Sequence, residues 1–125
     1  MSQQIWIITF NDTGEDLAQQ ADTLQEFLLQ ASSDSDIEVI QQPKSEYTQG
    51  GWVDLIITLV GAGGATKIAT DLINAIALWI KSRPDPSIDI TIKEGRITRV
   101  EAKQIKGKHA RQMLLAVLEQ LQDNN

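Results

Sequence analysis

The chain has 125 residues, with 11 basic and 17 acidic side chains and a formal net charge of −6. This length supports one domain around one core, and a content of 42% hydrophobic and 22% charged residues is typical of a chain that folds. The absence of cysteine excludes disulfides, thiolate zinc sites and thiol nucleophiles, and the single histidine, His109, excludes a histidine-rich metal cluster. The negative net charge disfavours general binding to nucleic acid. We expect no metal, no cofactor and no nucleic-acid partner.

The first predicted elements are a strand, a helix and a second strand. Residues 5–10 form a β-branched and aromatic run that is typical of a buried strand. Between 15 and 31, apolar residues recur with the spacing of an amphipathic helix. Ile37 to Ile40 indicates a short strand, and the polar segment 41–51 is interpreted as a loop. The N-terminus lacks the basic start and long apolar run of a signal peptide, so we expect a cytoplasmic protein.

The middle of the chain is strongly apolar and is interrupted by glycines. Residues 52–60 are compatible with a buried strand or an apolar helix, and their β-branched content slightly favours the strand. Gly61 to Gly64 then separates this run from a predicted helix over 65–81. The helix ends before Pro84, because the residue before a proline is disfavoured in the helical conformation.

Residues 87–103 carry the clearest local pattern, which is that of a β-hairpin. Three isoleucines alternate with polar residues from 88 to 93, Glu94-Gly95 fits a two-residue turn, and a second alternating strand follows. This second strand should place Val100 on the buried face and Arg99 on the opposite face. A last helix is expected over about 108–122, with His109 on its first turn.

Together these elements predict one α+β domain over 1–125, a two-layer sandwich with the order β-α-β-(β or α)-α-β-β-α. The helices should pack on a mainly antiparallel sheet.

The charge is distributed unevenly along the chain. Residues 1–60 hold ten acidic and one basic side chain, a balance of 1 − 10 = −9, whereas residues 61–125 hold ten basic and seven acidic, a balance of +3. Either the two halves expose separate solvated faces, or the surface is dipolar and attracts a partner or another copy. The candidate charged surface comprises Arg96, Arg99, Lys103, Lys106, Lys108 and Arg111.

The glycine cluster invites a comparison with a phosphate-binding loop. Gly61 to Lys67 ends in lysine, but Thr66 stands where the second glycine belongs and Ile68 where a serine or threonine would hold magnesium. Close backbone packing explains the glycines better, so nucleotide binding is the least favoured function.

The apolar segment 52–80 has three interpretations. Asp54, Lys67 and Asp71 interrupt it, which disfavours a constitutive membrane span, although contact with lipid in an activated state stays open. A monomer that buries the whole segment is a second possibility. We favour an interface in a homo-oligomer or a hetero-complex, with Trp52 or Trp79 as an anchor. The candidate interface residues are Trp52, Gly61, Gly63, Gly64, Ile76, Trp79 and Ile80.

The order of these motifs resembles that of the effector-associated constant component family, first type. The similarity comprises the glycine-flanked run 50–60, Gly61-Ala62-Gly63-Gly64, a helix that ends in the sequence 78–83, the hairpin 88–100 and the closing helix, and it is nearly full length. The resemblance implies a fixed partner that is encoded beside varying effectors, such as caspase-like or trypsin-like proteases, in bacterial conflict and programmed-cell-death systems. It implies no catalytic residues.

We therefore expect a non-enzymatic adaptor that binds an effector protein. The alternative is a membrane-acting or pore-forming effector that uses residues 52–80, and the third hypothesis is nucleotide binding at 61–67.

Overall fold

The computed structural model describes residues 4–11, 17–32, 37–43, 53–60, 65–82 and 87–123. Five strands, three helices and a short 3-10 turn occur in this part of the chain. In chain order they are β1 (Gln4–Phe10), α1 (Leu17–Ala31), β2 (Ile37–Pro43), β3 (Val53–Leu59), α2 (Ala65–Ser82), β4 (Ile88–Glu94), β5 (Ile97–Ile105), η1 (Gly107–His109) and α3 (Ala110–Asp123).

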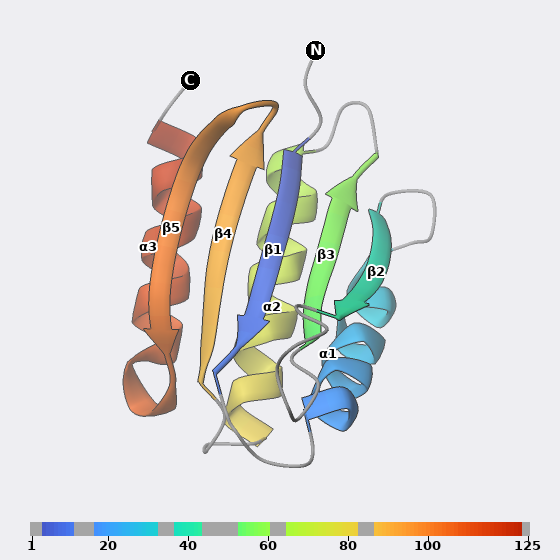
Figure 1. Cartoon of the computed structure of the whole chain (residues 1–125). Helices are drawn as coiled ribbons and strands as arrows, with labels where there is room; N and C mark the ends of the chain where they lie inside the picture. The colour runs from blue at the N-terminus through green and yellow to red at the C-terminus, as the bar shows by residue number, and fades with distance from the viewer. Residues whose placement is uncertain are drawn as a thin grey trace.

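The strands form one sheet with the order β2-β3-β1-β4-β5, and every neighbouring pair is antiparallel. All three helices lie on the same face of this sheet, α1 behind β2 and β3, α2 behind β1, and α3 behind β5 (Figure 1). This arrangement confirms the predicted α+β class and its two layers. It also shows that the first strand in the sequence becomes the central strand of the sheet.

The core lies between the sheet and the helices and follows a period of two along each strand. Alternate side chains of β1, β3 and β4 point toward the helices and are almost completely buried: Trp6, Ile8, Phe10, Leu55, Ile57, Leu59, Ile88, Ile90 and Ile92. The side chains between them are more exposed. The same alternation over 53–59 resolves the ambiguity of the middle segment, which is a strand.

Helix α2 is the most buried helix because it lies between α1 and α3 while also covering the sheet. Trp79 shows how tightly it is held: its ring meets Phe10 edge-on at a centroid distance of 5.8 Å. Its indole Nε1 donates a hydrogen bond of 3.1 Å to Thr23 Oγ1 on α1. One side chain of α2 thus joins the sheet to the neighbouring helix.

Three predicted boundaries are wrong. The two-residue turn of the hairpin is Gly95-Arg96 rather than Glu94-Gly95, because Glu94 still pairs with Ile97 in the sheet. Residues 41–43 were expected in a loop, but they continue β2 and pair with 53–55 of β3, because a strand partner satisfies their backbone polar groups. His109 lies in η1 rather than on the first turn of the last helix, which begins at Ala110. Gly107 begins η1 with φ +64°, a conformation that glycine adopts without a steric penalty.

Candidate protein-interaction surface

The structure places three of the predicted interface residues in the interior of the single chain. Ile76 and Trp79 are 0% exposed and Ile80 is 2% exposed, because this face of α2 packs on the sheet. The monomer therefore covers much of the apolar surface that suggested self-association. Trp52, Gly61, Gly63 and Gly64 lie outside the described residues, and so does most of the phosphate-loop motif.

The predicted basic set divides between the two ends of β5. Arg96 and Arg99 lie at the hairpin end, whereas the four others follow at or beyond the opposite end, where β5 leads through η1 into α3 (Figure 1). Arg96, Lys103, Lys106, Lys108 and Arg111 are exposed. Arg96 and Arg99 therefore lie at the other end of β5 from the remaining four residues.

Arg99 is less exposed than the strand pattern predicted, because β5 has a register shift there. Ile92 pairs with Val100 and Lys93 with Thr98, which leaves Arg99 as the extra residue of a β-bulge. Its guanidinium Nη1 donates to Glu94 Oε2 at 2.7 Å, and its side chain is 19% exposed.

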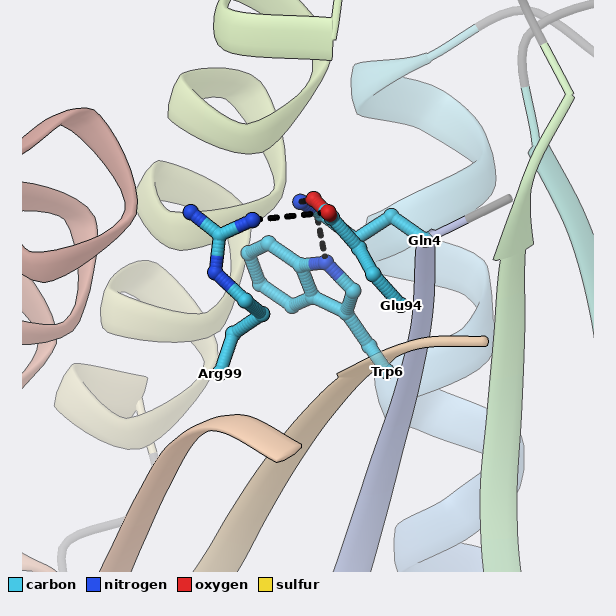
Figure 2. A network of polar contacts seen from close by, with 4 residues as sticks. All are labelled: Gln4, Trp6, Glu94 and Arg99. Carbon is cyan, nitrogen blue, oxygen red and sulfur yellow. Dashed lines mark hydrogen bonds and ion pairs between the residues drawn. The ribbon is translucent and has the colours of Figure 1, made fainter. Parts of the chain in front are cut away.

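This ion pair belongs to a polar network above the buried indole of Trp6 (Figure 2). Gln4 Nε2 donates to Glu94 Oε1 at 3.2 Å, and Trp6 Nε1 donates to Gln4 Oε1 at 2.8 Å. Each polar group of the network is used by another member, and the network connects β1, β4 and β5. We therefore assign Arg99 a structural role.

An exposed apolar groove lies between α2 and α3, with a volume of about 530 Å³. The two helices run in opposite directions on the same side of the sheet (Figure 1). The groove is lined by Ile73, Asn74, Ala77, Leu78, Ile80 and Lys81 of α2, and by Gly107, Lys108, Ala110, Arg111, Leu114 and Leu115 of η1 and α3. Leu78 is 59% exposed and Leu115 is 48% exposed, so two leucines present apolar surface to solvent there.

Every charged residue in the lining of the groove is basic: Lys81, Lys108 and Arg111. Lys81 lies in the last turn of α2, whereas Lys108 and Arg111 flank the start of α3, so the fold joins positive charges from two separate parts of the sequence. The groove therefore combines apolar walls with a positive rim on a chain whose net charge is −6.

Lys108 and Arg111 belong to the charged surface predicted from the sequence, whereas Lys81, Leu78 and Leu115 were not predicted as site residues. In each helix the sequence places a leucine among polar residues, which could have identified both leucines. The polar residues Lys67, Thr70, Asp71 and Asn74 recur along one side of α2. Leu78 lies on this side, four residues after Asn74 and three before Lys81, and Leu115 stands four residues after Arg111. A leucine at such a position on a helix that otherwise buries its apolar side indicates surface that the monomer does not cover.

The described ranges contain neither a metal-ligand cluster nor a membrane-spanning helix. The residues there bring together no group of three or more acidic, histidine or cysteine side chains that would suit a metal ion. Among the described helices, none has the length and hydrophobicity that crossing a bilayer requires.

Comparison with protein families identifies the chain. The model of the family described as Effector Associated Constant Component 1 matches residues 13–122. The chain belongs to this family. The match covers α1, α2, β2 to β5 and all but the last residue of α3, so it includes every residue that lines the α2–α3 groove.

Other comparisons add resemblances in shape alone. A de novo designed protein, Foldit4, has 12% identity and a TM-score of 0.49 over 77% of this chain and 100% of its own. A phage SAM lyase in complex with S-methyl-5'-thioadenosine has 12% identity and a TM-score of 0.40, over 80% and 86% of the two chains. A Csm3-Csm4 subcomplex of a type III-A CRISPR-Cas interference complex has 9% identity and a TM-score of 0.42, over 98% of this chain and 98% of its own. No curated protein sequence matches the chain.

Proposed function

We propose that this protein is a non-enzymatic adaptor that binds an effector protein in a bacterial defence or programmed-cell-death system. Membership of an effector-associated family supports a role beside an effector. The observation that carries the binding role is the α2–α3 groove, where Leu78 and Leu115 expose apolar surface inside a concave site. Two exposed leucines in one concave site are a sign of a binding surface, whereas an exposed apolar residue on its own, such as Ile97, needs no explanation.

The fold suits this role because it provides a rigid support for the groove. Both walls are helices whose inner sides are held by the core: Ile76 and Trp79 of α2 and Leu114 and Val117 of α3 are almost fully buried. A partner therefore meets walls that are already ordered, and binding loses little conformational entropy on this side.

Co-expression with the products of neighbouring genes tests the proposal. The tagged protein should form a complex with one of them that stays intact during size-exclusion chromatography, and light scattering should give a mass above 13.8 kDa. If the protein elutes alone with every neighbouring product, the adaptor function is wrong. Effector activity measured with and without the protein then tests whether binding matters for the system.

A further inference from the structure

The α2–α3 groove has the geometry that accommodates another helix. On α2, Asn74, Ala77, Leu78 and Lys81 line it, and these positions are spaced i, i+3, i+4 and i+7. The lining residues of α3 follow the same rule, since Leu115 is four residues after Arg111. Two antiparallel helices with such stripes leave a furrow between them, into which a third helix inserts side chains one turn apart.

The apolar part of the groove favours side chains of leucine size. Leu78 and Leu115 stand at the surface, while Ile73, Ile80 and Leu114 behind them are buried, so the exposed leucines are continuous with the core. Covering them removes apolar surface from water.

The charges select the polar residues of the occupant. Lys81, Lys108 and Arg111 are exposed, and the groove lining contains no acidic residue. Because the lining holds three basic residues and no acidic one, the groove attracts a negatively charged segment and repels a positively charged one.

From these three observations we infer that the α2–α3 groove binds an amphipathic helix of the effector, with leucine-sized residues on one side and acidic residues beside them. This inference rests on the proposed function and specifies the partner's chemistry. The groove is a concave site of about 530 Å³, so side chains of a helix can insert into it, whereas a flat lipid surface cannot fill it.

The probe is a synthetic helical peptide of about five turns, with leucines at i, i+4, i+7 and i+11 and glutamates on both flanks. Its control has lysine in place of every glutamate. We expect the acidic peptide to bind with a Kd of about 10–100 μM in low salt and to shift amide resonances of residues 74–81 and 108–115. The lysine peptide should bind at least about tenfold more weakly, and added salt should weaken the acidic peptide.

Matched variants separate the groove from the rest of the surface. Leu115→Asp and Arg111→Glu should each weaken binding at least about tenfold. Ile97→Asp and Arg96→Glu make the same kinds of change at the distant end of β5 and should leave the Kd within about twofold. All four positions are exposed, so thermal melting should show that each variant folds.

Three results would overturn the inference: no binding of the acidic peptide, equal binding of the two peptides, or equal losses in the groove and control variants. Sedimentation with phosphatidylcholine–phosphatidylserine vesicles provides a further test, since lipid binding that Leu115→Asp abolishes would assign the groove to a membrane.

The adaptor function and the groove inference can fail separately. If the effector complex survives Leu115→Asp and Arg111→Glu, the adaptor function stands and the groove is not its site. If the peptide binds the groove while no effector associates, the adaptor function is wrong.

Discussion

Replacing Trp79 with alanine should destabilise the folded monomer, and this outcome distinguishes a core residue from an interface anchor. The side chain is 0% exposed, meets Phe10 edge-on at 5.8 Å and donates a hydrogen bond to Thr23. Truncating a fully buried tryptophan costs about 3–5 kcal/mol, because the lost transfer free energy is increased by the cavity left behind. Domains of this kind are stable by about 5–15 kcal/mol, so the loss is a large fraction of the total.

A milder substitution separates ring packing from hydrogen bonding. Trp79→Phe keeps an aromatic ring beside Phe10 but removes the indole N–H. Thr23 Oγ1 also donates to the backbone carbonyls of Gln19 and Gln20, so its hydroxyl stays bonded after the change. The hydrogen-bond loss should then be about 1 kcal/mol, to which the smaller ring adds a packing loss. We therefore expect Trp79→Phe to lie between wild type and Trp79→Ala.

Urea unfolding followed by far-UV circular dichroism measures these differences, with tryptophan fluorescence as a second probe because Trp6 and Trp52 remain. Leu78→Ala is the matched control: its side chain is the neighbour of Trp79 on α2 but is 59% exposed, so its free energy of unfolding should stay within about 0.5 kcal/mol of wild type. The reasoning would be refuted if Trp79→Ala unfolded at the wild-type urea concentration but altered the mass of an assembly. That result would make Trp79 an interface anchor.

Three further predictions concern the sheet and the turn that follows it. Asp89→Ala should lower stability by about 1–3 kcal/mol, because Asp89 Oδ1 accepts hydrogen bonds from Asn11 Nδ2 at 2.7 Å and from a backbone N–H of β5 at 2.8 Å; an unchanged melting temperature would contradict this. A double-mutant cycle of Glu94→Gln and Arg99→Met should give a coupling free energy of unfolding of about 1 kcal/mol, because the ion pair is close and half-buried. A coupling free energy near zero would show that the pair is as weak as an exposed one. Gly107→Ala should cost about 1 kcal/mol in thermal unfolding through backbone strain alone, because φ is +64° and an added Cβ meets no atom within 4 Å; a cost several times larger would mean that the side chain clashes.

Local sequence patterns and long-range contacts determined different parts of this structure. The alternation of Ile88, Ile90 and Ile92 predicted β4, and the apolar spacing in 65–81 predicted α2, because side-chain periodicity and backbone geometry are linked within a few residues. Residues 53–59 were ambiguous, since a strand covered by helices and an apolar helix have similar compositions. Pairing with β1 and β2 on both sides decided the question.

The groove required the tertiary structure for a different reason. Lys108 and Arg111 are visible in the sequence as basic residues, but their joining with Lys81 depends on how α3 returns beside α2. The tertiary structure also determines which apolar residues of α2 are buried. Trp79 lies in the core and Leu78 faces solvent, although they are adjacent in sequence. The sequence by itself determined every element except the one at 53–59, together with the order of the elements and the family pattern. Only the packing of the helices determined which apolar side chains the chain covers and which stay exposed, because burial depends on neighbours far away in the sequence.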